Sequence, residues 1–198
     1  MDIMEKYKDL NNSLANLLKS SPKLLILGIG ENRMGDDGAG VYITWELWQK
    51  WGKTANIEII NGGITPEERL SEILDFQPEL VLIVDVIDLK KPSGTIGIFE
   101  EDKMLNYLPI SSHSLPLPVF VDRIKMGISG VDIKLVGICP YSLQFLESYE
   151  LYKEDLWTLD MKEDNPNIPF YSFNLTKEME KVCKELIDVL SEVLKQYY

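Results

Sequence analysis

The stretch LLILGIGENRMGDDGAGV, residues Leu24 to Val41, decides the fold. It begins with an apolar run that is too short for anything other than a buried strand, and the residues Gly28–Gly30 then turn the chain. The sequence GDDG, Gly35–Gly38, follows at the mouth of the next helix. A buried strand that ends in a glycine-rich turn is the usual start of a doubly wound α/β domain. Nucleotide-binding proteins leave bare backbone N–H groups for phosphate at the position where this chain has two adjacent carboxylates.

Length and charge limit the class of protein. The chain has 198 residues, which predicts one α/β domain over residues 1–198 with a large buried core. It carries 20 Lys and Arg against 32 Asp and Glu, and its net charge is therefore −12. This shortage of basic residues argues against nucleic-acid binding, because affinity for phosphates comes from Lys and Arg. The acidity indicates either a solubilising surface or attraction to a basic segment of a partner.

Cysteine usage and hydropathy indicate the compartment. The two cysteines, Cys139 and Cys183, form no CxxC pair and fall in a strand-like and a helical run. We expect reduced core thiols in a cytoplasmic protein. The sequence has no signal peptide and no apolar stretch near 18 residues, so we expect neither export nor membrane insertion.

The periodicity predicts alternating strands and helices. Thr65 and Pro66 mark a helix start, with a Thr N-cap, Pro at the first helical position and Glu68 three residues past the cap. The order implies a mostly parallel, three-layer sheet with helices on both faces. A helix over 1–20 and an irregular segment over 147–173 are additions to this core. We expect strands at 23–29, 57–61, 80–85, 95–99 (at the sheet's edge) and 131–139 (central), and further helices at 37–51, 65–76, 117–126 and 176–196.

The predicted strand order brings three side chains together as a candidate metal site. Ligands in such sheets bind beyond the carboxyl ends of the strands, near the point where strand order reverses. Asp37 follows the first strand, Asp85 ends the third, and His113, the single histidine, lies in the loop after the edge strand. Two carboxylates and one imidazole suit a divalent metal with open positions. Carboxylates about 4 Å apart repel by some 1 to 4 kcal/mol, and a cation or a basic substrate would offset that repulsion.

Structural interpretations of the same residues stay open. Asp36 and Asp37 stand where acids cap a helix N-terminus, Asp85 stands where Asp forms a turn, and a lone histidine is often structural. A dinucleotide-binding loop fits poorly, because Arg33 stands where the fingerprint needs glycine. A serine nucleophile also fits poorly, because the serines around His113 lie in no G-x-S-x-G elbow.

Four motifs, in order along the chain, resemble the hydrogenase maturation endopeptidases. They are LGIGENRMGDDGAG, NGG at Asn61–Gly63, VDVIDLKKPSG at Val84–Gly94 and SSHSLPL at Ser111–Leu117. The likeness covers roughly residues 23–140. It implies a five-stranded twisted sheet with helices on both faces. It also implies a peptidase that removes a short C-terminal extension from a nickel-containing hydrogenase large-subunit precursor after metal loading.

The resemblance also assigns roles to residues. Asp37, Asp85 and His113 match the residues that contact metal in the family, and the nickel they meet is carried by the precursor. We therefore expect Asp37 and Asp85 to be catalytic as well, and the site to bind other divalent ions in vitro. Asp36 is a candidate general base or an orienting cap. The chain departs from the family in having Glu31 for the usual Asn and Asn61 for the usual Asp.

Two other functions use the same residues. A non-catalytic, nickel-dependent chaperone would grip the large subunit without cutting it. A metal-dependent phosphate-ester hydrolase is disfavoured, because no basic cluster accompanies the acids. We expect a monomer whose partner is the large-subunit precursor.

Overall fold

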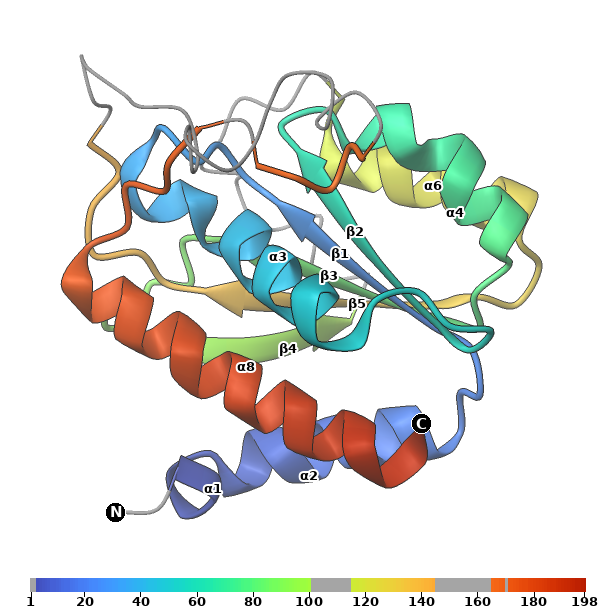
Figure 1. The fold of residues 1–198 in the computed structure, drawn as a ribbon, viewed down its shortest axis with the longest axis horizontal. Coiled ribbons are helices and arrows are strands. Elements are labelled where there is room, and N and C mark those ends of the chain that lie inside the picture. The colour runs from blue at the N-terminus through green and yellow to red at the C-terminus, as the bar shows by residue number, and fades with distance from the viewer. Residues whose placement is uncertain (1–2, 101–114, 145–164, 170) are drawn as a thin grey trace.

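A five-stranded sheet forms the centre of the computed structural model, which describes residues 3–100, 115–144, 165–169 and 171–198 (Figure 1). The strand order is β2-β1-β3-β5-β4. Four strands are parallel and β4 is antiparallel at one edge, so the predicted mostly parallel sheet and its edge strand are confirmed. The strands are β1 Leu24–Ile29, β2 Ile57–Gly63, β3 Leu80–Val86, β4 Ile96–Glu100 and β5 Asp132–Ile138.

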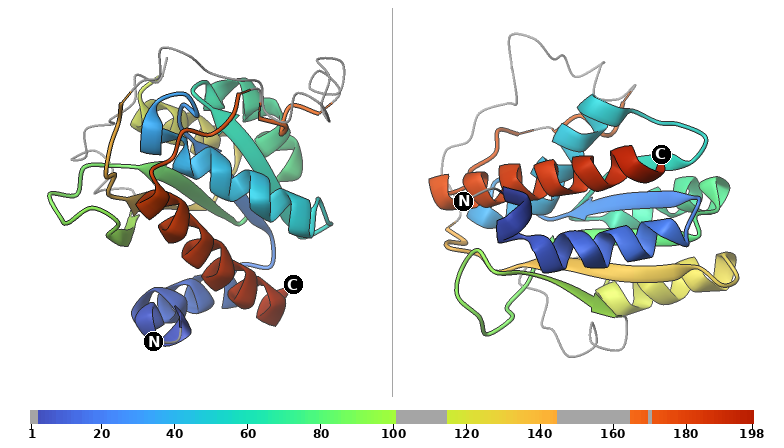
Figure 2. Two further views of the ribbon diagram at one scale, coloured as in Figure 1. Left: turned by 60° about the vertical axis from the view of Figure 1, so that its left-hand side comes forward. Right: turned by 90° about the horizontal axis from the view of Figure 1, so that it is seen from below.

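Helices cover both faces of the sheet, as predicted. α2, α3 and α8 pack on one face, and α4 and α6 pack on the other (Figures 1 and 2). Alternate residues of each strand feed the two apolar clusters, and for this reason β1 and the first five residues of β3 read as unbroken apolar runs. The helices are α1 Ile3–Lys6, α2 Lys8–Lys19, α3 Ala39–Trp51, α4 Leu70–Phe76, α6 Leu117–Gly127 and α8 Lys177–Tyr197.

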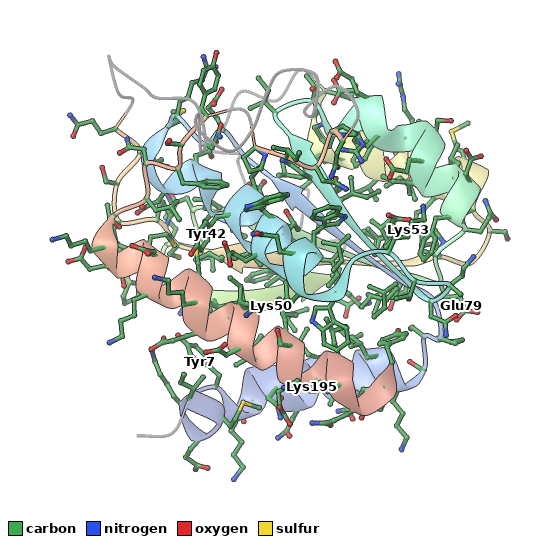
Figure 3. The ribbon with its side chains drawn as sticks, in the orientation of Figure 1. Tyr7, Tyr42, Lys50, Lys53, Glu79 and Lys195 are labelled. Atoms are coloured by element: carbon green, nitrogen blue, oxygen red, sulfur yellow. The ribbon has the colours of Figure 1, made fainter. Side chains whose placement is uncertain are left out.

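The N-terminal segment forms two helices rather than the single helix expected over 1–20. The break falls at Tyr7, whose hydroxyl donates to Glu185 Oε2 of α8 at 2.8 Å (Figure 3). Lys6 Nζ lies 2.5 Å from the same carboxylate oxygen. Leu14 and Leu18 of α2 are fully buried in the cluster beneath α8. The ends of this segment are therefore set by its contacts with α8, which local periodicity does not report.

Two predicted helices begin with a tighter turn. The 3₁₀ helices η1, Gly35–Gly38, and η2, Pro66–Arg69, precede α3 and α4. The expected side-chain cap from Thr65 is wrong, because its hydroxyl makes no capping hydrogen bond. Glu68 N instead donates to the Thr65 carbonyl oxygen at 3.0 Å, so main chain satisfies this donor in the 3₁₀ turn.

A close approach of α3 to the sheet fixes the position of η1. Gly28, which we expected in a turn, lies inside β1. A Cβ there would stand 2.2 Å from the Gly40 carbonyl oxygen. A Cβ on Gly40 would stand 2.3 Å from the Val84 oxygen and 2.4 Å from the Ile29 oxygen. These distances are too short for real Cβ contacts, so glycine at both positions lets the helix start rest on β1 and β3.

Strand order places a switch point between β1 and β3. The chain leaves β1 for β2 on one side, and then crosses over to β3 on the other. The carboxyl ends of β1 and β3 are neighbours, because Gly28 is in register with Val84. Ligand sites of open α/β sheets lie at such a point.

The predictions from hydropathy and from cysteine usage can be compared with the described residues. Among the residues that the structure describes, no helix has both the length and the apolar character needed to cross a bilayer. Cys139 and Cys183 are both free and buried.

Gly40→Ala tests the close packing of α3. We expect it to lower the free energy of unfolding by about 2 kcal/mol, because the added Cβ meets main-chain oxygens of two strands. Urea denaturation measures the change, with the exposed Asn12→Ala of α2 as the control. Elsewhere in a helix, Gly→Ala gains up to about 1 kcal/mol. A gain at position 40 would contradict the packing described above.

Candidate active site

Asp37 is buried at the carboxyl end of β1. The main chain turns at Gly30, whose φ is +138°, and returns through η1, so that Asp37 lies against the turn. Glu31 N donates to Asp37 Oδ2 at 2.7 Å, and Asp37 N donates to the Met34 oxygen at 3.2 Å. A Cβ on Gly30 would stand 1.9 Å from the Asp37 carbonyl oxygen. The turn thus fixes both the main chain and the carboxylate of Asp37.

Asp85 is buried near the end of β3. The strand continues to Val86, and Asp85 is in register with Gly137 of β5. Val86 N donates to Asp85 Oδ1 at 2.7 Å. The side chain therefore binds main chain, as in a turn-forming Asp, but it does so inside a strand. Both Asp37 and Asp85 are at most 1% exposed.

The fold brings the two carboxylates to the same edge of the sheet. η1 contacts β3, and β1 and β3 are neighbours. His113 lies outside the described residues, so its place beside the carboxylates stays a prediction. The chain re-enters the described part at Leu115, which packs with Leu117 in the apolar cluster that also holds Ile83 and Ile87. Within the described ranges, no group of three His, Cys, Asp or Glu side chains has a metal-binding arrangement.

Asp36 is a structural anchor. Its Oδ2 accepts hydrogen bonds from Tyr141 N at 2.8 Å and Ser142 N at 2.9 Å. Its Oδ1 accepts from Thr176 N at 2.7 Å, and the Thr176 hydroxyl donates to Oδ2 at 3.2 Å. Both oxygens of this fully buried carboxylate are thus occupied by donors from other parts of the chain. These hydrogen bonds are those of an orienting cap, and the general-base role of Asp36 stays a prediction.

The cap acts on a distant helix. Thr176 is the N-cap of α8 and its hydroxyl accepts from Met179 N at 3.1 Å. Asp36 accepts the N–H of the same N-cap residue, which is the part played by an N3 glutamate in a capping box. The box is therefore completed by a residue 140 positions away in the sequence. Local capping patterns cannot reveal such a pair.

Glu31 and Arg33 form a second feature that the sequence did not reveal. Arg33 donates to the Glu31 carboxylate from Nε at 2.9 Å and from a terminal nitrogen at 2.6 Å. These hydrogen bonds hold the pKa of Glu31 below its ordinary value of 4.5. The Arg33 guanidinium also lies over the Tyr171 ring, 4.9 Å from its centroid. An Asn at position 31 would offer one acceptor oxygen and could not form this two-pronged contact.

A cleft opens beside these groups. Its volume is about 410 Å³, and it lies at the ends of β1 and β2. The turn after β1 lines one part of it, and the glycines at the end of β2 line another. The lining includes Gly30, Glu31, Asn32, Arg33, Val41, Asn61, Gly62, Gly63, Ile64, Thr65, Glu68, Arg69, Pro166, Pro169 and Tyr171.

Comparisons with known proteins agree on one class. The sequence profile described as "Hydrogenase maturation protease" matches residues 41–154, more than half of the chain. A Methanocaldococcus jannaschii chain, named provisionally as a hydrogenase maturation protease, is 32% identical over 65% of this chain and 83% of its own length. The hydrogenase 3 maturation protease of Escherichia coli K12 is 30% identical over 59% of this chain and 72% of its own.

The solved structures give the same result. The crystal structure of a [NiFe] hydrogenase maturation protease from Thermococcus kodakarensis has a TM-score of 0.70 and 27% identity. The match covers 92% of this chain and 99% of the crystallised one.

Asp36→Asn separates an anchor from a general base. Because an amide nitrogen would face main-chain N–H donors, we expect the free energy of unfolding to fall by about 3 kcal/mol. Guanidinium denaturation measures it. Thr176→Ser keeps the hydroxyl and should change stability by less than about 0.5 kcal/mol. Unchanged stability of Asp36→Asn, together with lost activity, would restore the general-base interpretation.

Arg33→Met tests the Glu31 contact. Without the guanidinium, the pKa of Glu31 should rise toward 4.5, and an NMR titration of the carboxyl carbon measures it. A lowered folded-state pKa means that the pair stabilises the protein above about pH 4.5 and that this stability is lost as pH falls through the folded pKa. In Arg33→Met, the free energy of unfolding should not show this decrease at low pH. An unmoved Glu31 pKa would show that Arg33 is not its cause.

Proposed function

We propose that this chain, which belongs to the hydrogenase maturation protease family, removes a C-terminal extension from a nickel-containing hydrogenase large-subunit precursor. One observation carries the proposal beyond family membership. Two buried carboxylates, Asp37 and Asp85, lie at the switch point of the sheet, and the turn after β1 that holds Asp37 also lines the cleft through Gly30 and Glu31. Burying two carboxylates at one edge of the sheet costs free energy, and a cation that meets them offsets this cost.

The nickel belongs to the substrate. In this proposal the precursor presents nickel held by its own cysteines, and Asp37, Asp85 and His113 complete its coordination. Carboxylate and imidazole donors are suitable ligands for such an ion. Cleavage then depends on a loaded precursor, because an unloaded one offers these side chains no metal. The ion can polarise the scissile carbonyl or lower the pKa of a bound water.

The chain's own residues orient the reacting groups. Main-chain N–H groups of Glu31 and Val86 each hold one oxygen of an acid, Asp37 and Asp85 respectively, and this fixes the direction of both carboxylates. Asp36 accepts hydrogen bonds from the loop after β5 and from the N-cap residue of α8. These bonds fix η1 and with it the adjacent Asp37. In the cleft, Gly62 and Gly63 leave room for the main chain of the extension.

Three substitutions test the site together. Asp37→Asn, Asp85→Asn and His113→Ala should each lower the processing of a nickel-loaded precursor by at least about 100-fold, because each removes a donor to the ion. Mass spectrometry of the precursor measures the loss of its C-terminal extension. The matched control is Asp75→Asn, an exposed acid of α4, which should cleave normally.

The same measurement decides between cutting and binding. A nickel-dependent chaperone would bind the precursor and leave its mass unchanged, whereas a protease shortens it. Full activity of all three site variants would overturn the assigned site.

A further inference from the structure

The side chain of Asn61 joins two main-chain groups of opposite polarity. Asn61 lies in β2. Its Oδ1 accepts from Gly63 N at 3.0 Å, and its Nδ2 donates to the Asn167 carbonyl oxygen at 3.3 Å. The N–H of Gly63 can only donate and the carbonyl of Asn167 can only accept. An amide satisfies both, whereas an ionised carboxylate can only accept.

The side chain of Asn167 also takes part in this network. Its Oδ1 accepts from Asn61 N at 3.0 Å and from a terminal nitrogen of Arg69 at 3.2 Å. The other terminal nitrogen of Arg69 donates to the Asn61 carbonyl oxygen at 2.8 Å. Arg69 is itself held by Glu72, whose Oε2 accepts from Nε at 2.9 Å. We call Asn61, Arg69 and Asn167 the amide clamp.

The amide clamp fixes one wall of the cleft. Asn167 is 7% exposed and Ile168 is 3% exposed, so these two residues anchor the segment 165–169. Ile168 N donates to the Asn165 carbonyl oxygen at 3.1 Å, which closes the segment into a turn. Pro166 and Pro169, on either side of the anchors, line the cleft. The position of these prolines therefore depends on Asn61, which lies about 100 residues earlier in the chain.

The lining of the cleft favours one class of ligand. The guanidinium groups of Arg33 and Arg69 are already paired with glutamates, so they offer little net charge. Ile64 is 41% exposed, and Pro166, Pro169 and Tyr171 add further apolar surface. Main-chain groups of the β2 terminus stand beside them. Glu68 adds an acid to this lining, so the surface suits an extended peptide better than an anionic small molecule.

We propose that Asn61 is a positioning residue: through the amide clamp it holds the segment 165–169 as the wall against which the extended C-terminal segment of the precursor binds. This inference rests on the proposed function. The clamp needs a hydrogen-bond donor on the side chain at position 61. An aspartate there would place a carboxylate oxygen against the carbonyl of Asn167.

Asn61→Asp tests the clamp. It leaves the Asn167 carbonyl without its donor, so we expect faster hydrogen exchange at the Ile168 amide and about tenfold weaker binding of the nickel-loaded precursor. Biolayer interferometry measures that affinity. In cleavage assays the KM should rise by about tenfold while kcat changes by less than about twofold, because the clamp acts on binding.

Two further Asn→Asp changes serve as comparisons. At Asn167, the described side-chain hydrogen bonds are all accepted by Oδ1, which a carboxylate retains, so Asn167→Asp should weaken binding less than Asn61→Asp. At the exposed Asn12 of α2, the same change should leave exchange and affinity as in the wild type.

The outcomes separate this inference from the proposed function. Wild-type affinity of Asn61→Asp for the precursor would overturn the inference, whether or not exchange at Ile168 becomes faster. If the wild-type chain binds the precursor without cutting it, and Asn61→Asp weakens that binding, the result would support the clamp and overturn the proposed cleavage. A wild-type chain that does not bind the precursor would overturn both.

Discussion

One buried carboxylate, that of Asp36, connects three parts of the chain that are far apart in sequence. It accepts hydrogen bonds from the loop after β5 and from the first residue of the α8 cap, and it belongs to the turn that follows β1. Hydrogen bonds to a charged acceptor in a dry interior are strong, and each donor left without it would be costly. The direction of the neighbouring Asp37 therefore depends on residues near 141 and 176. The remaining parts of the site build on this fixed turn.

The strands could be predicted from the sequence because both faces of a parallel sheet are buried. Runs such as Leu80 to Val84 carry no polar residue, and short apolar runs between turns have few alternatives. Helix ends were predicted less well. The break at Tyr7 depends on Glu185 of α8, and the 3₁₀ starts of η1 and η2 depend on which main-chain groups lie nearby. Such ends are set by tertiary contacts, which no local pattern contains.

The candidate site divides in the same way. Strand order alone predicts that Asp37 and Asp85 share one edge of the sheet, because parallel strands end together. Neighbouring acids look equivalent in sequence, however, and coordinates are needed to see that Asp36 faces α8 while Asp37 faces the turn at Gly30. The partner Asn167 was not predicted either, since it stands in a segment expected to be irregular. The position of His113 stays a prediction.

The contacts of Asn61 also bear on how this protein behaves in a crowded solution. β2 is an outer strand of the sheet, and unpaired groups on such a strand invite pairing with another chain. Here Thr54 exchanges hydrogen bonds with Ile57 at the start of the strand, while Asn167 and Arg69 bind the main chain of Asn61 at its end. The outward-facing main-chain groups at both ends of β2 are therefore hydrogen-bonded within the same chain. These contacts oppose edge-to-edge self-association through β2, next to the irregularity at which Gly28 pairs with Asn61 and Ile29 with Gly63.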